Sequence, residues 1–259
     1  MEHCLLADPL QIAQQNMLLS YTSLARGVGN TTIHVDEAGT WVTSSHPLSF
    51  CHFTAGFSRN SDPARDDKLL QLSNNPNGHW VFVCDGPNPS GLKSHFLNLG
   101  FTCRQSLVTM MSTEPGEVTP LLSEALSPEA RSDISGFMAN QFFLNLGHPS
   151  RRLVSRATAR SSHRLLTIAN PEEITGAMMI TDCQDSLGLY NLCVEESYRY
   201  QGLGSMLVQS AKELAYRKRI PLILQCQPKL VRWYESLGFS EIGFLHALHR
   251  GREKFRDII

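Results

Sequence analysis

The chain has 259 residues, of which 42% are hydrophobic and 18% are charged, and its formal net charge is −1. This composition provides the apolar side chains of a globular core and excludes a disordered chain. The near-zero charge gives no overall basic field that would hold a polyanion. A nucleic-acid partner would therefore require a local basic patch, and we expect no such partner.

The sequence carries no sign of a membrane, a secretory route or a metal. No segment approaches the ~18 consecutive apolar residues of a membrane span, and the first residues lack the charged and apolar regions of a signal peptide. The seven cysteines are odd in number, scattered and free of any C-x-x-C pair, and the ten histidines show no metal-ligand spacing. We therefore expect reduced thiols, a cytoplasmic location, no membrane association and no bound metal.

In the first part of the chain, hydrophobic patterning predicts alternating helices and strands. The expected helices cover residues 9–25, 64–72 and 90–99. The expected strands cover residues 31–35, 40–44, 48–57, 79–84 and 101–111. Residues 112–120 are rich in Pro, Gly and charge, which is typical of a linker.

The second part begins with a well-marked helix, since Ser127 is a good N-cap and Pro128 a good first residue. We expect this helix to run to Leu146 and to stop at Gly147. Further helices are expected at residues 150–160, 202–217 and 229–237. Further strands are expected at residues 164–169, 174–181, 187–194, 221–226 and 239–248.

The two parts resemble each other in sequence order. Residues 79–87 (HWVFVCDGP) precede the segment SHFLNLGF at 94–101, and residues 220–228 (IPLILQCQP) precede RWYESLGF at 232–239. Both run strand, short helix, Leu-Gly-Phe, strand. A repeat more than a hundred residues long indicates duplicated domains rather than a solenoid. We predict an α/β (α+β) fold with domains at 1–115 and 121–259, each a mixed, mostly antiparallel sheet flanked by helices.

A candidate anion site lies where the strand expected at 187–194 leads into the next helix. The connecting segment contains Arg199 and the turn Gly202-Leu203-Gly204, and an amphipathic helix follows at once. Glycines allow a tight turn and close approach of the backbone to a ligand. The first N–H groups of a helix and its dipole favour an anion such as phosphate, to which Arg199 adds a charge and Ser205 a hydroxyl. No third glycine follows at the spacing of a dinucleotide-binding fingerprint.

Two motifs here resemble those of one superfamily. Residues 194–204, from Val194 through Arg199 to Gly202 and Gly204, are similar to the acetyl-CoA loop of the GNAT N-acetyltransferases, V-x-x-x-x-[QR]-x-x-G-x-[GA]. About thirty residues later, residues 234–239 (YESLGF) supply the second GNAT pattern, Y-x-x-x-G-F. The resemblance covers roughly residues 125–250 and implies the GNAT fold there. In the first part of the chain, the resemblance is limited to the topology of the expected strands and helices.

The resemblance implies roles for individual residues. The pantetheine arm and the acetyl carbonyl would be bound by free backbone groups at the end of the strand, those of Leu192, Cys193 and Val194. The pyrophosphate would be cradled by the segment Arg199, Tyr200, Gln201, Gly202, Leu203 and Gly204, with Ser205 beside it. Gln227 stands about where the family often has an Asn near the CoA arm. Tyr234 would protonate the departing CoA thiolate; the alternative is an aromatic packed in the core beside Trp233.

The general base is left open by the sequence. Many GNAT proteins carry a Glu on the fourth strand, but residues 187–193 contain no acidic side chain. Four acidic residues flank this strand, namely Asp182, Asp185, Glu195 and Glu196. The amine could instead lose its proton through water, or to a group from the first part of the chain.

The first part lacks a counterpart of the glycine loop. The corresponding segment, residues 58–67, has no glycine and contains Asp62, Asp66 and Asp67, which would repel a diphosphate. The glycines in residues 26–29 (RGVG) precede a strand, so no helix end stands behind them. The counterpart of Tyr234 is His95 or Phe96. We therefore expect a degenerate GNAT-like domain that does not bind CoA.

These inferences predict an acyltransferase that moves an acetyl group from acetyl-CoA to a primary amine by direct attack. The acceptor would be a small molecule or a peptide. One alternative is a CoA-binding pseudoenzyme that acts as a sensor or interaction module without turnover. Another is an acyltransferase that uses a longer acyl group.

Overall fold

The computed structural model describes residues 8–46, 48–57, 62–88, 91–118, 122–169 and 173–251. The α-helices are α1 (Pro9–Val28), α2 (Pro63–Ser73), α3 (Leu92–Asn98), α4 (Pro128–Phe142), α5 (His148–Arg160), α6 (Leu203–Lys218) and α7 (Val231–Glu235). Short 3₁₀ helices are η1 (Ser49–Cys51), η2 (Glu196–Tyr198) and η3 (Pro228–Leu230).

The strands of the first half are β1 (Thr31–Asp36), β2 (Gly39–Ser44), β3 (Phe53–Ala55), β4 (His79–Asp85) and β5 (Thr102–Ser112). Those of the second half are β6 (Leu122–Glu124), β7 (Arg164–Ala169), β8 (Ile174–Cys183), β9 (Ser186–Val194), β10 (Leu222–Cys226) and β11 (Ser240–Arg250).

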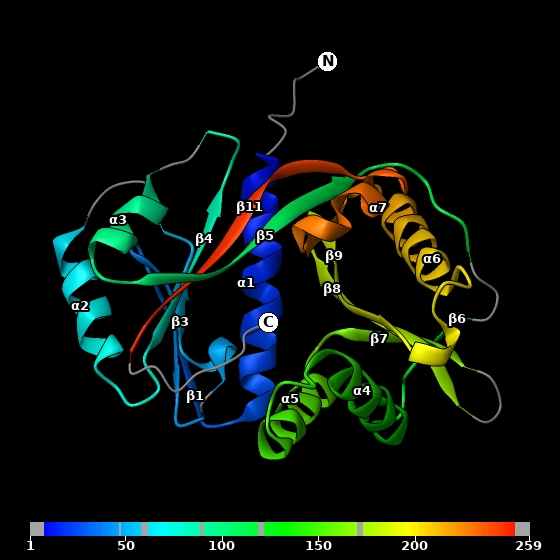
Figure 1. Ribbon diagram of the computed structural model, residues 1–259, viewed down its shortest axis with the longest axis horizontal. Helices are drawn as coiled ribbons and strands as arrows, with labels where there is room; N and C mark the ends of the chain where they lie inside the picture. Colours follow the sequence, from blue (N-terminus) through cyan, green and yellow to red (C-terminus); the bar gives the residue numbers. More distant parts are fainter. Residues whose placement is uncertain are drawn as a thin grey trace.

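The strands form one sheet of eleven strands in the order β1-β2-β3-β4-β11-β5-β10-β9-β8-β7-β6 (Figure 1). Among the strands that the structure describes, only the pairs β3–β4 and β9–β10 are parallel. The prediction of mixed, mostly antiparallel pairing with flanking helices is thus confirmed. The prediction of a separate sheet in each half is wrong, because the described strands join into a single sheet.

The two halves are joined because each contributes its last strand to the other. β11 from the end of the chain lies between β4 and β5, and β5 lies between β11 and β10. Near the middle of the β5–β11 pair, Leu107 faces Leu245. The predicted division into residues 1–115 and 121–259 therefore describes two stretches of sequence, and their independence as domains stays a prediction.

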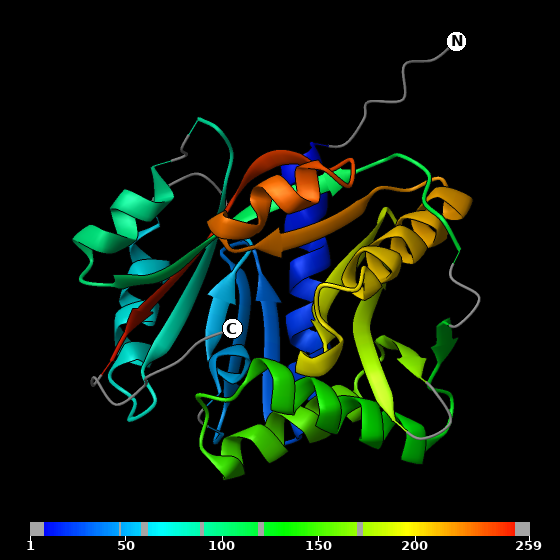
Figure 2. The same ribbon diagram turned by 45° about the vertical axis from the view of Figure 1, so that its right-hand side comes forward.

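Helices cover both faces of the sheet, and β8 shows how its alternating side chains separate the two layers. Met178 and Ile180 pack in the cluster that contains Leu207 of α6, whereas Ala177 and Met179 pack in the cluster that contains Met138 of α4. In the first half, α1 covers one face and α2 with α3 the other (Figure 2). The parallel pair β9–β10 thus lies between layers, with α6 and α7 on one side.

Most predicted elements are present, with differences at three places. The helix expected to reach Leu146 ends at Phe142, and Phe143 and Leu146 instead pack against the cluster around Val28. The strand expected at 48–57 is a 3₁₀ turn followed by only three strand residues. The three-residue strand β6 was not predicted. Among the described residues, no helix is both long and apolar enough to cross a membrane.

Candidate functional site

The site begins where β9 leaves its parallel neighbour β10. The two strands pair only from Leu187–Leu222 to Leu189–Leu224. β9 continues to Val194, and its register with β8 shifts between Ala177 and Met179, near Asn191 with its φ of 48°. Such a bulge bends a strand away from its neighbour. The end of β9, which is predicted to bind the pantetheine arm, therefore separates from β10 and leaves its backbone unpaired on that side.

Leu192, Cys193 and Val194 lie on this separated stretch, as the resemblance implied. Val194 and Cys193 remain paired with Gly176 and Ala177 of β8 on the other side. Burial raises the pKa of the Cys193 thiol to about 12. This thiol is therefore protonated at neutral pH, which disfavours a role as a nucleophile, and the binding role of the Cys193 backbone stays a prediction.

The glycine turn opens α6 without a side-chain cap. Gly202 is the N-cap with φ 82°, and no side chain bonds to the first helical N–H groups. Met206 N–H is the first to bond back, to the Gly202 carbonyl at 3.0 Å. The N–H groups of Leu203, Gly204 and Ser205 thus precede the first intrahelical bond and point from the helix end. They form an anion-binding arrangement.

The two glycines of this turn do different things. Gly202 occupies the left-handed region, which favours glycine, and a Cβ there would meet no atom within 4 Å. A Cβ on Gly204 would lie 3.6 Å from the Trp233 ring and 3.9 Å from Val194, which are ordinary contacts. Gly202 is therefore required by the backbone, whereas Gly204 keeps the space in front of the helix end free of a larger side chain.

Arg199 is held beside the turn by two hydrogen bonds. Its Nε donates to the Val194 carbonyl at 3.2 Å, and its Nη2 donates to Gln141 Oε1 of α4 at 3.1 Å. Tyr200 is fully exposed with φ 63°, and the Gln201 side chain donates back to the Ser197 carbonyl at 3.2 Å. Sequence reasoning missed Gln141, because it lies outside both motifs on a separate helix.

Tyr234 of α7 is 6% exposed and packs against two aromatic rings. Its ring centroid is 4.6 Å from Trp233 and 5.6 Å from Phe239. Burial, with a smaller effect of the Cys226 thiol, raises the pKa of the Tyr234 phenol. The phenol is thus protonated at neutral pH and can donate. Since a Cβ on Gly204 would lie 3.6 Å from the Trp233 ring, α7 lies close to the glycine turn.

Gln227 is exposed at the end of β10, where its carbonyl accepts a hydrogen bond from Leu230 N–H at 2.8 Å. Its place after the parallel strand agrees with the predicted position near the CoA arm. Its role in binding stays a prediction.

Two of the candidate bases lie at the wrong end of β9. Asp182 and Asp185 lie at the β8–β9 turn, about eight residues, or ~26 Å, from Val194 along the strand. Asp182 also forms an ion pair with Lys218. These two carboxylates are therefore far from the glycine turn.

The other two acidic candidates belong to the turn itself. The Glu195 carboxylate bonds to the Ser197 hydroxyl and to Ser197 N–H, the latter at 2.7 Å, and these bonds lower its pKa. Glu196 is exposed in η2. Sequence reasoning missed a further carboxylate, that of Glu241 on β11, which is exposed. Glu241 is paired with Met110 of β5 in the sheet, and the Met110 sulfur lies 3.6 Å from Cys226 Sγ at the end of β10.

The first half carries a different arrangement at the start of α2. Asp62 accepts hydrogen bonds from Ala64 N–H at 3.0 Å and Arg65 N–H at 3.3 Å. The Arg65 guanidinium is buried over the rings of Phe57 and Phe96 and bonds to Asp66 at 3.1 Å. At this helix end, the first N–H groups are thus satisfied by the chain's own Asp62 carboxylate.

Two further residues that the sequence singled out in the first half, His95 and Gly27, have internal contacts. His95, a counterpart of Tyr234, bonds to Asp66 at 2.9 Å. Gly27 lies in α1, where a Cβ would come 2.3 Å from the Ala157 carbonyl oxygen, so this glycine permits close packing of α1 on α5. Residues 58–61 of the expected loop lie outside the described residues.

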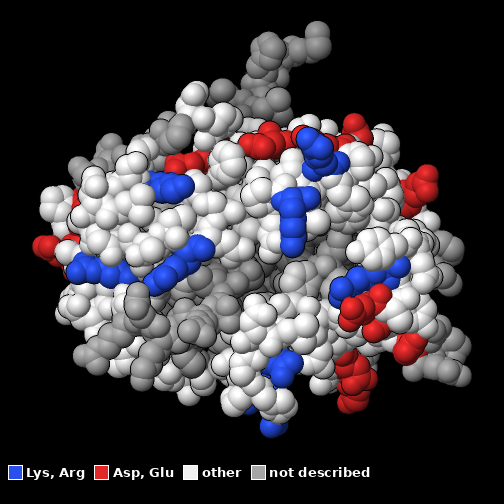
Figure 3. Space-filling model, viewed as in Figure 1, with Lys and Arg blue, Asp and Glu red and all other residues white. Residues whose placement is uncertain are grey.

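Basic and acidic side chains are interspersed on the face shown in Figure 3. Within the ranges that the structure describes, no three His, Cys, Asp or Glu side chains gather in a way that could hold a metal ion.

Comparisons with known proteins bear on the family and the fold of this chain. Residues 161–241 match the family model of the acetyltransferase (GNAT) domain. Among curated proteins, none matches this chain in sequence. The fold is similar to a GCN5-related N-acetyltransferase from Kribbella flavida, with TM-score 0.64, 13% identity and coverage of 92% of this chain and 95% of that one.

Two further solved structures extend the likeness. A GCN5-related N-acetyltransferase from Sphaerobacter thermophilus matches with TM-score 0.53, 12% identity and coverage of 83% and 81%. A tandem GNAT protein from the clavulanic acid biosynthesis pathway matches with TM-score 0.54, 10% identity and coverage of 96% and 97%. The resemblance to the GNAT acetyltransferase superfamily is confirmed: the family model matches in the second half, and the likeness in fold spans the chain.

Proposed function

We propose that this protein is an acyltransferase that moves an acetyl group from acetyl-CoA to a primary amine. The observation that carries the proposal is the meeting of three features at the carboxyl ends of β9 and β10. These are the separated end of β9, the uncapped start of α6, and the buried phenol on α7. The GNAT fold supports the class of reaction, and the acceptor is a small molecule or a peptide.

The residues present fit acetyl-CoA. The pyrophosphate would bind to the free N–H groups of Leu203, Gly204 and Ser205, with Arg199 beside them. The turn offers backbone N–H groups and a cation rather than a carboxylate cap, as an anion requires. The separated stretch of β9 would pair with the pantetheine arm as a strand would. When bound, acetyl-CoA supplies an activated acetyl thioester.

Three contributions from this chain would drive the transfer. Backbone N–H groups on the separated stretch of β9 stabilise the developing negative charge on the acetyl oxygen. The neutral amine attacks the carbonyl carbon directly, and the carbon–sulfur bond breaks. Tyr234 gives its proton to the sulfur as it leaves, a step whose catalysis contributes on the order of 10²–10⁴ in rate.

The amine must lose a proton before or during the attack. Glu195 is bound to its own turn, and Asp182 and Asp185 lie too far away. Water, Glu196 or Glu241 therefore remains as the acceptor of this proton. The exposed position of Glu241 on β11 gives it contact with solvent, through which a proton can pass.

An acetylation screen tests the proposal. The full chain with acetyl-CoA is assayed against polyamines, amino acids, aminoglycosides and peptides, while calorimetry measures acetyl-CoA binding. Turnover of an amine supports the proposal. Tight binding of acetyl-CoA without turnover of any amine would favour the pseudoenzyme, for which the lack of an acidic residue in β9 is the supporting observation. Preference for a longer acyl-CoA would favour the other alternative.

A further inference from the structure

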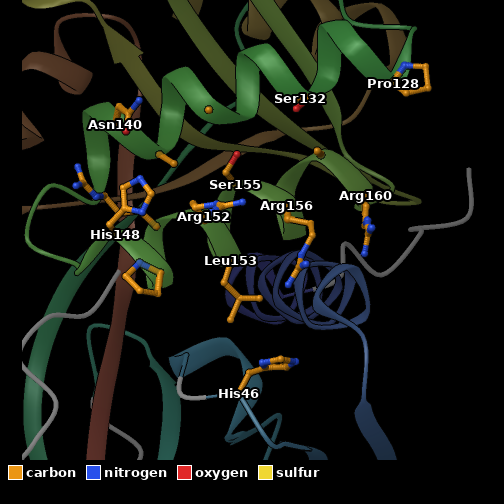
Figure 4. Close-up of a pocket in the computed structure, with 15 residues that line it drawn as sticks. His46, Pro128, Ser132, Asn140, His148, Arg152, Leu153, Ser155, Arg156 and Arg160 are labelled. Carbon is orange, nitrogen blue, oxygen red and sulfur yellow. The ribbon is translucent and has the colours of Figure 1, made fainter.

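A second candidate site lies away from the glycine turn, in a cavity of about 880 Å³ between α4 and α5 (Figure 4). His46, which follows β2, forms part of its wall. Six basic or imidazole side chains line it, namely His46, His148, Arg151, Arg152, Arg156 and Arg160. No acidic side chain is among the residues that line this cavity. A volume of this size is typical of sites for small molecules.

The four arginines of this cavity lack partners within the described part of the chain. None of them forms an ion pair or a side-chain hydrogen bond with those residues. Arg151 Nε is moreover buried without a hydrogen-bond partner there. A buried donor left unpaired destabilises the fold, and more so when it is charged. An anionic ligand in the cavity would satisfy this group.

The spacing of the arginines makes a row. Arg152, Arg156 and Arg160 follow each other at intervals of four residues on one face of α5, so the row is about 12 Å long. The helix contains no acidic residue. A solvated basic face commonly has acidic partners, as in α6, where Arg217 bonds to Glu213 at 2.7 Å. Like charges on α5 repel one another, and a bound polyanion would relieve this repulsion.

We propose that this cavity, which we call the α4–α5 groove, binds a small molecule that bears two or more phosphate groups. Guanidinium groups bind phosphate oxygens in a bidentate manner, and the row matches more than one phosphate. Neutral polar side chains of Ser132, Asn140 and Ser155 line the same cavity and can bind the uncharged part of such a ligand. The overall charge of the protein is near zero, so this is the local patch that a phosphorylated ligand requires.

The groove is distinct from the proposed acetyl-CoA site but shares a helix with it. Asn140 lines the groove, and the next residue, Gln141, bonds to Arg199 beside the glycine turn. Since CoA also carries phosphates, the test must separate the two sites. Gly204→Glu is expected to block the glycine turn and to leave the groove intact.

The experiment measures binding of inorganic tripolyphosphate to the full chain by calorimetry at 50 and 150 mM salt. Because the glycine turn of the wild type can itself bind phosphate groups, the number of sites is measured in Gly204→Glu, where we expect one molecule per chain and weaker binding at the higher salt. Arg152→Gln with Arg156→Gln should weaken binding at least 10-fold, because both side chains are exposed and their loss should not disturb the fold. Arg217→Gln with Lys218→Gln removes the same charge from α6 and should change binding by less than 2-fold. Gly204→Glu should also bind tripolyphosphate normally.

Several outcomes would overturn the proposal. No binding at 150 mM salt, or equal weakening in the α5 and α6 variants, would show only a general effect of charge. Loss of binding in Gly204→Glu would place the phosphate at the glycine turn. Citrate binding as tightly as tripolyphosphate would reject a preference for phosphate. Binding of an RNA oligonucleotide but not of tripolyphosphate would indicate a nucleic-acid surface in place of a small-molecule site.

Discussion

The starts of α6 and α2 show how two similar halves differ in the feature that we propose to bind an anion. α6 opens at Gly202, in the left-handed region, and no side chain caps its N–H groups. α2 opens at Asp62, whose carboxylate accepts from two of those groups. Each helix follows the outer strand of the parallel pair in its half. The same place in the fold therefore offers free donors in one half and satisfied donors in the other.

The difference extends to what surrounds each helix end. Near α6, Arg199 donates a hydrogen bond to the Val194 carbonyl at the end of β9, and the Trp233 ring lies close to Gly204. Near α2, Arg65, Asp66 and His95 bond to one another, and Phe57 and Phe96 pack on the guanidinium. A fold can thus be kept while its anion site is replaced by an internal network of a few side chains.

The largest expected effect comes from closing the site in the second half. Gly204→Glu places a carboxylate beside the free N–H groups of α6, where a pyrophosphate would bind. We expect acetyl-CoA to bind at least 100-fold more weakly, or about 2.7 kcal/mol, as measured by calorimetry, with little change in melting temperature.

The matched control is Gly204→Ala. Its Cβ would lie at ordinary contact distance from Trp233, so it adds bulk without charge, and affinity should fall by less than about 5-fold. Unchanged affinity in Gly204→Glu would show that the anion does not bind at this turn.

The difference between the two helix starts could largely be predicted from the sequence, whereas the pairing of the strands could not. The glycine turn, its helix and the acidic segment around Asp62 are local patterns, and local patterns predict local structure. The exchange of β5 and β11 is not local. Leu107 and Leu245 would be buried in a central strand whichever neighbour they had, so hydrophobic patterning cannot choose between a strand's own half and the other half. Gln141 was missed for a similar reason, since its bond to Arg199 joins distant segments.

Acid should destabilise both halves, because each has a buried neutral histidine. Burial lowers the pKa of His79 to about 3 and that of His163 to about 4. The unfolded chain binds these protons near the ordinary pKa of about 6.5. Stability is thus full above pH 6.5 and is lost as the pH falls, by about 1.4 kcal/mol per unit for each histidine, or about 2 kcal/mol each at pH 5.

Urea unfolding at pH 7 and pH 5 measures this loss. His163→Gln, whose amide can still donate to the Ser20 carbonyl, should lose about 2 kcal/mol less than the wild type between the two pH values. Equal losses would mean that His163 titrates normally. Because the sheet is continuous across both halves, we expect one unfolding transition, and two separate transitions would contradict that expectation.

The substitution Tyr234→Phe tests the chemistry of the second half. Phe keeps the ring and its packing against Trp233 and Phe239 but removes the proton donor. We expect kcat to fall by about 10-fold or more, towards the 10²–10⁴ of a general acid. The KM for acetyl-CoA should change little, because the proton moves only in the transition state.

Steady-state kinetics on an acceptor found in the screen give both constants. Phe96, at a corresponding place in the first half, is fully buried, and Phe96→Leu serves as the control. It should affect stability but not kcat. A wild-type kcat in Tyr234→Phe would assign Tyr234 to the core alone, and the acetyl-CoA site would still stand on the glycine turn.

The smallest expected effect comes from removing the cap in the first half by Asp62→Ala. The carboxylate accepts from Ala64 and Arg65 N–H groups, and the loss of such a cap costs about 1 kcal/mol of stability. The free N–H groups that result would resemble those of α6. We nevertheless expect one acetyl-CoA per chain in the variant, as in the wild type, because Arg65, Asp66 and His95 still occupy the space before the helix. Calorimetric stoichiometry and urea unfolding give the two readouts. A second equivalent of acetyl-CoA bound to Asp62→Ala would mean that this one carboxylate, and not the network behind it, prevents the first half from binding acetyl-CoA. Two equivalents bound to the wild type would refute the interpretation of the first half as degenerate.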